Sequence, residues 1–259
     1  MVTAAKCFAE EGFPVLMTGF DKYGKGETGL QFVHQLQQAI PKGDAVILPL
    51  PYTPGGGILN APYSEKQILL ETVFRLADRA KVICGGMLPM EDERYFDYYD
   101  EPMMLRNADV TAEAALLMAG EKMEGCLGGA SLLVVGYGRI GKRLAAKARA
   151  LGCNVTVAAR KESDHALIRI CGHHAIGFDK LEEAVSKAGA VCNTVPAEVF
   201  SERILQKIPA GVPLIDLAGS IVGEKVIRAS GLPGKYAPET AGLILAESLK
   251  RIFKREGLL

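Results

Sequence analysis

The sequence predicts an α/β protein with two parallel-sheet domains, separated by a cleft that two helices bridge. Short apolar runs typical of buried strands alternate with helix-like amphipathic segments. The alternation forms two successive blocks, and a further helix-like segment follows each block. We therefore expect residues 1–110 with 238–259 to form one domain and residues 111–237 the other.

In the first block, residues 14–20, 45–50 and 81–84 are apolar enough to be buried strands. Residues 66–80 place apolar side chains at helical spacing, which predicts a helix between the last two strands.

The second block repeats this pattern. Its predicted strands are residues 131–135, 154–159, 190–194 and 213–217. The two connecting helices are predicted at residues 111–124 and 241–255. Thr111 suits the N-cap of the first, with Glu113 in its first turn.

Composition argues against several classes of protein. Among 259 residues, thirty basic side chains balance thirty acidic ones, so the net charge favours neither nucleic acid nor an anionic membrane as partner. No apolar stretch is long enough to span a bilayer, and the first residues do not resemble a signal peptide. We expect a cytoplasmic protein.

The six cysteines form no Cys-x-x-Cys pair, which predicts buried free thiols in a reducing compartment. Cys171, His173 and His174 lie close in sequence, but they lack a second ligand pair at a known spacing. We predict no metal site.

The strongest motif follows the strand at residues 131–135. Gly136, Gly138 and Gly141 fit G-x-G-x-x-G and open an alanine-rich helix. The first glycine permits a tight turn, the second lets backbone N–H groups approach a pyrophosphate, and the third allows close packing. The helix N-terminus adds partial positive charge. A turn without a ligand is the alternative. This motif predicts a Rossmann-like dinucleotide site, and the similar alternation predicts two Rossmann-like domains.

Arg160 lies at the end of the next strand, where an acidic residue would bind the ribose hydroxyls of NAD. With Lys161 and Ser163 it offers cations and a hydroxyl to a 2′-phosphate, which favours NADP. A solvated basic turn is the alternative. The predicted cofactor-binding residues come from three strand ends. They are Gly136, Tyr137, Gly138, Arg139, Ile140, Gly141, Arg160, Lys161, Thr194, Val195 and Pro196.

Strand ends of the first block carry further glycines. Gly55 and Gly56 follow one predicted strand, and Gly86 with Met87 follows another. Glycines there either let backbone amides contact an anion or form a mobile loop. We take these four as candidate substrate-binding residues. None of the histidines lies at a convincing strand end, so a histidine acid or base is not predicted.

Several segments together resemble the family of dipicolinate synthase A subunits. In chain order they include LMTGFD, AVILPLP, RNADVTAEAAL, VVGYGRIG, NVTVAAR, NTVPAEVF, LIDLAG and GLPGKYAPETAGLILAESL. The glycine motif is generic, whereas RNADVTAE with GLPGKYAPETAG is far more specific. The resemblance covers nearly the whole chain.

The resemblance implies an NADP-dependent oxidoreductase acting on a CH–CH group in sporulation. The product would be dipicolinate, and the precursor a dihydrodipicolinate or the hydroxylated tetrahydrodipicolinate that dehydrates to it. It also implies self-association and a flavoprotein-like partner, the B subunit of dipicolinate synthase. Helix starts at Thr111 and Thr240 would line the cleft and offer N–H groups to the dicarboxylate substrate.

One departure concerns the start of the chain. Family members begin with a strand and a Gly-Gly-Asp turn before the first helix, whereas this sequence begins inside that helix. We therefore expect the first domain to lack its first strand, which would expose two unpaired edges. A misassigned start or a truncation is the alternative.

Catalytic candidates are Glu113, as general base, and Asn107, as a residue that orients the ring. The alternative for Glu113 is a carboxylate that stabilises its own helix dipole. Two other functions stay open: a 2-hydroxyacid-dehydrogenase-like enzyme, and a cofactor-binding protein whose partner performs the chemistry.

Overall fold

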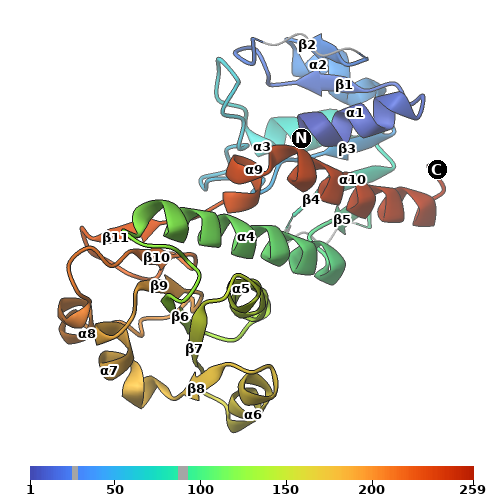
Figure 1. Ribbon diagram of the computed structural model, residues 1–259. Helices are drawn as coiled ribbons and strands as arrows, with labels where there is room; N and C mark the ends of the chain where they lie inside the picture. Colours follow the sequence, from blue (N-terminus) through green and yellow to red (C-terminus); the bar gives the residue numbers. More distant parts are fainter. Residues whose placement is uncertain (25–28, 87–92) are drawn as a thin grey trace. The chain divides into compact units, whose positions relative to one another are not determined.

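The computed structural model describes residues 1–24, 29–86 and 93–259, and these divide into two compact units. Unit 1 comprises Met1–Met104 with Pro238–Leu259, and unit 2 comprises Leu105–Ala237. The chain passes from one to the other inside helix α4 (Glu101–Lys122) and again at the start of α10 (Pro238–Arg255). Each unit is an α/β structure with parallel sheets, as predicted (Figure 1). The predicted bridged cleft stays a prediction.

Unit 2 contains a six-stranded parallel sheet. Its strands are β6 (Ser131–Val135), β7 (Asn154–Ala158), β8 (His174–Ile176), β9 (Ala190–Asn193), β10 (Leu214–Asp216) and β11 (Val226–Arg228). The spatial order is β8-β7-β6-β9-β10-β11. Counted along the chain this is 3-2-1-4-5-6, the order of the dinucleotide-binding Rossmann fold. The order reverses between β6 and β9, so a ligand site is expected at their carboxyl ends.

Helices cover both faces of this sheet, because alternate strand residues point to opposite sides. Leu132 and Val134 belong to one buried cluster, which α4, α5 and α6 help to form. Leu133 and Val135 belong to the other, which includes α7 and α8. The helices of unit 2 after α4 are α5 (Arg139–Ala150), α6 (Glu162–Ile170), α7 (Leu181–Ser186), α8 (Glu202–Lys207) and α9 (Leu232–Tyr236), with a 3-10 turn η2 (Phe178–Lys180).

Unit 1 holds two small parallel sheets among its described residues. One pairs β1 (Leu16–Thr18) with β2 (Gln31–Val33), and the other has the order β3-β4-β5, with β3 (Ala45–Ile47), β4 (Val82–Gly85) and β5 (Tyr95–Asp97). The remaining elements are α1 (Val2–Glu10), α2 (Leu36–Ala39), the 3-10 turn η1 (Ile40–Lys42) and α3 (Leu70–Leu76).

Helices α1 and α10 lie side by side in unit 1 (Figure 1). Phe8 and Phe253 join them, with ring centroids 5.3 Å apart. A Cβ at Gly242 would lie 2.4 Å from Thr3 Cβ, so glycine permits the close approach.

Two predicted helices begin elsewhere. The helix predicted at residues 66–80 starts only at Leu70, because the residues before it pair in an extended conformation with residues 57–59. In this pairing Leu59 N donates to the Ile68 carbonyl, and Leu70 N donates to the Gly57 carbonyl. Helix α4 starts at Glu101, ten residues before Thr111. Asp100 Oδ1 accepts a hydrogen bond from Met103 N at 2.9 Å and caps it.

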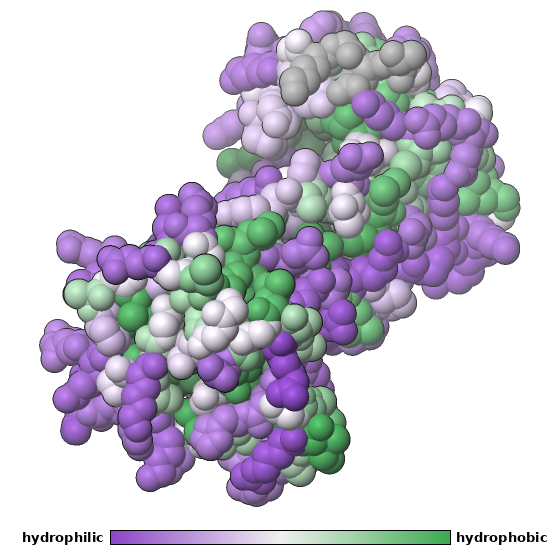
Figure 2. All heavy atoms as spheres, viewed as in Figure 1, coloured by the Kyte–Doolittle hydropathy of each residue, from purple (hydrophilic) through white to green (hydrophobic). Residues whose placement is uncertain are grey.

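Hydrophilic residues cover most of the face shown in Figure 2, and hydrophobic residues reach it in patches. Ile170 and Val222 are the most exposed large apolar side chains among the described residues, at 81% and 83%. In the described ranges, no helix combines the length and apolar character needed to cross a bilayer.

Candidate functional site

The glycine turn after β6 is held by close contacts. Gly136 has φ +99°, and a Cβ there would lie 2.5 Å from Thr194 Oγ1. A Cβ at Gly141 would lie 2.2 Å from the carbonyl oxygen of Gly136. Thr194 is fixed in turn, because its N–H and its Oγ1 both donate to the Val135 carbonyl, at 2.8 and 2.9 Å. The turn therefore has no room for larger residues at these two glycines.

Gly138, in contrast, faces open space. A Cβ there would meet no atom within 4 Å. It is the N-cap of α5 and offers no side-chain bond to the first turn, which begins with Arg139 and Ile140. Backbone N–H groups at this helix end can therefore bind an anion, and the residues present fit a dinucleotide pyrophosphate.

The side chain of Tyr137 belongs to the core. The residue is 9% exposed and packs within the cluster that includes Leu144 and Val157. Burial raises its pKa to about 12, and Lys142 Nζ lies 5.5 Å from the ring centroid. Only the backbone of Tyr137 is therefore suited to contact a ligand.

The loop after β7 carries two exposed cations. Neither Arg160 nor Lys161 makes a side-chain hydrogen bond or ion pair with any residue in the described ranges. Lys161 is the N-cap of α6 and supplies no side-chain bond to its first turn. Two acidic residues, Glu162 and Asp164, occupy that turn. They oppose a bound anion, but the Glu162 side chain is 90% exposed, so water screens its charge.

A buried polar network joins the ends of β9 and β10. Asn193 is fully buried, and its Nδ2 donates to Asp216 Oδ1 at 2.9 Å and to Ser220 Oγ at 3.0 Å. Asn193 Oδ1 accepts from Val195 N at 3.1 Å, and Ser220 Oγ donates to the Val195 carbonyl at 2.7 Å. The network thus fixes Val195, while Pro196 lies exposed beside it.

Asp216 is 1% exposed and accepts three backbone bonds besides that from Asn193. Their donors are Ala218 and Gly219, each at 3.1 Å, and Ile221 at 2.8 Å. The predicted cofactor-binding residues did not include Asn193 or Asp216, although both lie at the carboxyl ends of predicted strands. Their signal was present, because each is a polar residue that ends an otherwise apolar buried run.

The prediction that Thr111 caps a helix is wrong. Thr111 lies in the interior of α4, and its Oγ1 donates to the Asn107 carbonyl one turn earlier, at 2.7 Å. Free helix-end N–H groups are therefore not available at Thr111 or Glu113. The reason is the Asp-Glu-Pro sequence at residues 100–102, which favours a helix start there.

Glu113 faces helix α5. Its Oε2 lies 3.0 Å from Lys147 Nζ, and Asp109, one turn earlier, accepts from Arg143 at 2.6 Å. Burial alone would raise the pKa of Asp109, but hydrogen bonds from Arg143 and Lys147 outweigh burial and hold it below the ordinary value. Asn107 lies about 120° around the helix from Glu113, at about 100° per residue. The two catalytic candidates thus occupy different faces of α4.

Thr240 lies in the first turn of α10, which starts at Pro238 rather than at residue 241. It is exposed. The position agrees with the predicted helix start, and a role in substrate binding stays a prediction.

The glycines of unit 1 differ among themselves. Gly55 and Gly56 have φ of +123° and +62°, and a Cβ at either would meet nothing within 4 Å. A Cβ at Gly86 would lie 2.3 Å from Leu50 Cδ1 and 3.3 Å from the Tyr98 ring. Gly86 is therefore a packing position, whereas the first two are open. Met87 lies outside the described residues.

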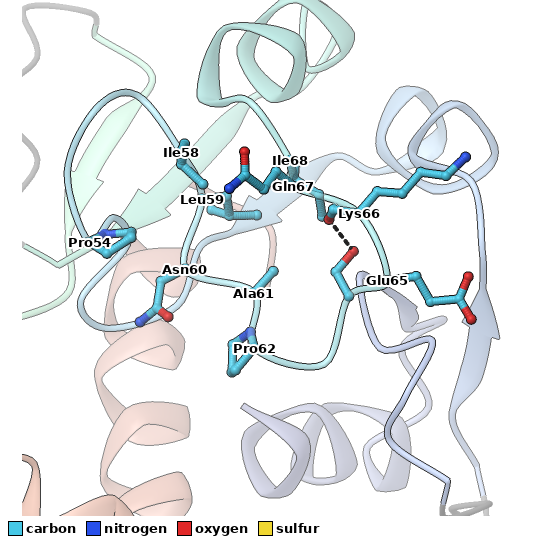
Figure 3. Close-up of a pocket in the computed structure, with 11 residues that line it drawn as sticks. Pro54, Ile58, Leu59, Asn60, Ala61, Pro62, Glu65, Lys66, Gln67 and Ile68 are labelled. Carbon is cyan, nitrogen blue, oxygen red and sulfur yellow. Dashed lines mark hydrogen bonds between the residues drawn. The ribbon is translucent and has the colours of Figure 1, made fainter.

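A surface pocket of about 240 Å³ is formed mainly by the segment that follows Gly55 and Gly56 in the chain. It is lined by Pro54 and by residues 58–62 and 64–68, and Figure 3 shows Asn60 and Gln67 among apolar side chains there. Ser64 Oγ donates to the Lys66 carbonyl at 2.8 Å and shapes its rim. Gly55 and Gly56 are not among the lining residues.

His34 corrects the expectation that no histidine lies at a strand end. It directly follows β2, and its Nδ1 lies 2.9 Å from Asp21 Oδ1, beyond the end of β1. Ser64 Oγ and Glu65 N donate to Asp21 Oδ2 at 3.4 and 3.2 Å. Hydrogen bonds from His34 and Glu65 hold the pKa of Asp21 below its ordinary value. The His34 side chain is 85% exposed.

All six cysteines are free, as predicted, but their predicted burial holds only in part. Cys84, Cys153 and Cys192 are buried, whereas Cys126 and Cys171 are exposed. Burial raises the pKa of Cys84 and Cys192 to about 12, which makes both thiols poor nucleophiles. Among the described residues, no group of three or more acidic, histidine or cysteine side chains could hold a metal ion.

Comparison with known families divides the chain at α4. Residues 1–101 match the family described as the N-terminal domain of the dipicolinate synthase A subunit. Residues 104–229 match the NAD binding domain of D-isomer specific 2-hydroxyacid dehydrogenases. Unit 2 is therefore a dehydrogenase-like NAD(P)-binding domain.

Known proteins similar to the whole chain point the same way. The dipicolinate synthase A subunit of Bacillus subtilis (strain 168) is 26% identical over 263 residues, which cover 94% of this chain and 89% of the relative. A crystal structure of the A chain of dipicolinate synthase from Bacillus subtilis superposes with a TM-score of 0.81 at 25% identity, covering 99% of this chain and 93% of that one.

Two further structures, at lower sequence identity, show the fold alone. The dipicolinate synthase A subunit from Bacillus halodurans has a TM-score of 0.83 at 24% identity, over 97% of this chain and 93% of that one. An L-alanine dehydrogenase has a TM-score of 0.68 at 14% identity, over 100% and 86%. The architecture is thus shared by proteins with different activities.

Proposed function

The chain belongs to the family of dipicolinate synthase A subunits, and from this membership we propose that it is an NADP-dependent oxidoreductase that forms dipicolinate in sporulation. The substrate in this proposal is dihydrodipicolinate, or its hydroxylated tetrahydro precursor after loss of water. Family membership supports the substrate class, and the strand ends of unit 2 support the cofactor.

The reaction removes two electrons and two protons from a dihydropyridine ring. One ring C–H bond breaks with hydride transfer, a second ring proton passes to a base or water, and the ring becomes aromatic. Bound NADP⁺ supplies the hydride acceptor. The chain has to bind the dinucleotide, orient the ring and neutralise two carboxylates.

The observation that carries the cofactor assignment is the pair Arg160 and Lys161. Strand β7 neighbours β6 in the sheet, so these cations follow the strand beside the glycine turn. Both are exposed, and neither has a side-chain partner in the described ranges. A guanidinium and an ammonium in that place suit a 2′-phosphate, and no carboxylate takes the position that binds the ribose of NAD.

Titration with NADPH and NADH, followed by nicotinamide fluorescence, tests this assignment. The protein should bind NADPH more tightly. Arg160→Asp should weaken NADPH binding at least tenfold, since a charge-assisted bond is worth about 1.5–3 kcal/mol, and should leave NADH binding equal or tighter. Arg169→Asp, on the same helix–loop segment but in the last turn of α6, is the matched charge control. Equal affinities in the unmodified protein would contradict NADP dependence.

The proposal includes a proton acceptor and an orienting group on α4. Glu113 is the proposed acceptor, and Asn107 the proposed orienting group. Glu113 is 66% exposed, and only its Oε2 bonds Lys147. The structure directly supports the ion pair, whereas the catalytic role is supported by sequence alone. Because the two residues occupy different faces of α4, they are tested separately.

Glu113→Gln should lower turnover about a hundredfold and leave NADPH affinity within twofold, since glutamine cannot accept the proton. Lys147→Gln removes the same ion pair and keeps the carboxylate. Equal activity in both variants would leave Glu113 with the ion pair as its only role. Asn107→Ala should raise KM more than it lowers kcat.

We include in the proposal self-association and a complex with the B subunit of dipicolinate synthase. The naming of the relative as one subunit of that enzyme supports a complex. Dipicolinate formation, followed by absorbance, should be faster with the two proteins together than with this chain alone. Equal rates would remove the need for the partner. Gly55, Gly56 and Thr240 are proposed substrate contacts.

A second candidate function is hydride transfer to a 2-oxo acid. It is favoured by the match of unit 2 to 2-hydroxyacid dehydrogenases and by the His34–Asp21 pair, the histidine–carboxylate arrangement such an enzyme needs. NADPH oxidation with simple 2-oxo acids, lost in His34→Gln, would support it. Unit 1 matches a different family, which favours the first function.

A further inference from the structure

The loop that carries Arg160 is fixed at both ends by one residue, His165. The His165 Nε2 atom lies 2.8 Å from the carbonyl oxygen of Ala159. Its backbone N–H donates to the carbonyl oxygen of Lys161 at 3.0 Å. The second bond is the i→i−4 backbone bond that begins helix α6, whereas the first, which holds the carbonyl of the residue before Arg160, depends on the histidine side chain.

The direction of the side-chain bond follows from its partner. A carbonyl oxygen can only accept, so His165 Nε2 carries the hydrogen. The histidine is 8% exposed and Ala159 is 2% exposed, so water cannot readily replace the bond. The N–H of Ala159 is also engaged, because it donates to the Ile176 carbonyl at 3.0 Å. Both backbone groups of Ala159 are therefore fixed.

The side chains that would contact the 2′-phosphate are not held by hydrogen bonds in this way. Arg160 and Lys161 have no side-chain partner in the described part of the chain, and both are long and exposed. Ordering a long side chain around an anion costs rotamer entropy, and a mobile backbone adds to that cost. When the backbone at Arg160 is already fixed, only the side-chain torsions have to be ordered as the anion binds.

We propose that His165 is a positioning residue for cofactor selectivity: it fixes the Ala159–Lys161 backbone so that Arg160 meets the 2′-phosphate of NADP. This inference rests on the proposed NADP dependence. His165 touches no part of the cofactor and acts through Arg160.

The test compares NADPH and NADH affinities in two variants. His165→Leu places a buried apolar side chain there and removes both the donor to Ala159 and the Nδ1 atom that lies 3.5 Å from Glu162 Oε1. His165→Gln is the matched control, because its amide nitrogen can replace Nε2 as donor. His165→Leu should weaken NADPH binding about three- to tenfold, the range for one hydrogen bond, and change NADH binding less than twofold. His165→Gln should restore most of the preference.

A double variant separates positioning from general stability. In an Arg160→Ala background, His165→Leu should cause no further change in the NADPH-to-NADH ratio, because the residue through which it acts is gone. Thermal unfolding of each variant shows whether unit 2 is folded at the temperature of the titration. His165→Gln keeps the test decisive if the leucine variant does not fold.

The outcomes distinguish the two proposals. If the unmodified protein binds NADH as tightly as NADPH, the proposed cofactor falls, and this inference with it. If the protein prefers NADPH and Arg160→Ala removes the preference, but folded His165→Leu keeps it, only the role of His165 is overturned. An equal loss for both cofactors, in both backgrounds, would also overturn it, since that is the signature of a purely structural residue.

Discussion

The two glycine-rich strand ends of this chain use glycine for different physical reasons. After β6, Gly136 and Gly141 lie where a Cβ would come within 2.5 Å of neighbouring atoms. After β3, Gly55 and Gly56 have left-handed backbone conformations and no neighbour within 4 Å. Packing thus requires glycine at both positions of the first pair, although Gly136 also has φ +99°, whereas backbone conformation alone requires glycine at the second pair. A glycine-rich segment alone therefore does not indicate an anion site.

The two units also use a carboxylate differently. Asp216 in unit 2 is 1% exposed and joins two loops beside the cofactor turn through four bonds. Asp21 in unit 1 is partly exposed and pairs with the exposed His34. The loops around the glycine turn are thus preorganised by a buried hydrogen-bond network, whereas the His34–Asp21 pair is accessible to water.

The largest expected effect is that of Gly141→Ala. The new Cβ would meet the Gly136 carbonyl, and Gly136 cannot retreat because Thr194 and Val195 are already close. We expect a destabilisation of about 3 kcal/mol, as for an overpacked core, and about a hundredfold weaker dinucleotide binding. Thermal unfolding and NADPH titration measure the two effects.

Gly56→Ala is the matched variant in unit 1. Its neighbourhood is open, so only the left-handed φ opposes the alanine, at about 1–2 kcal/mol. Dinucleotide affinity should not change. If Gly141→Ala were no more harmful than Gly56→Ala, the contrast between packed and open glycines would be lost.

Asp216→Asn should have the next largest effect. The amide has one acceptor oxygen, so it turns an N–H group toward a backbone donor, either Ile221 N or the pair Ala218 and Gly219. An unsatisfied buried donor costs about 1–3 kcal/mol. NADPH binding should weaken with the loosened Val195 loop. Asp21→Asn should change the free energy of unfolding by less than half as much. Equal losses in chemical denaturation would show that burial does not separate the two carboxylates.

Gly86→Ala should have the smallest effect. The nearest atom, Leu50 Cδ1, is the end of a flexible side chain that is 36% exposed, so it can move aside. We expect a destabilisation below about 1 kcal/mol and dipicolinate formation within twofold. A large rise in substrate KM without loss of stability would instead indicate that Gly86 binds substrate.

Sequence patterns located the elements that are long or fully buried. Strand β6 has the predicted bounds, and β7, β9 and β10 fall within one or two residues of them. Strands β2, β5, β8 and β11 were not predicted. Each has three residues and a largely exposed or half-buried pattern, so neither length nor apolar periodicity marks it.

The start of α4 shows how a local signal was misjudged. Thr111 has the residue type of an N-cap, but Asp100 and Pro102 make a stronger start ten residues earlier, and the intervening residues suit a helix. Once the helix continues through Thr111, its hydroxyl bonds to the Asn107 carbonyl instead.

The sequence by itself determined the dinucleotide turn and the charge beside it. Gly136, Gly138, Gly141 and Arg160 lie within one strand–helix–strand segment, where fixed spacing sets which groups meet. The tertiary structure alone decided which of these glycines are packed, since Thr194 approaches from 58 residues away. It also decided the pairing of Asn193 with Asp216 and of His34 with Asp21. Residue types show that such groups need partners, but only the folded chain brings a particular donor to a particular acceptor.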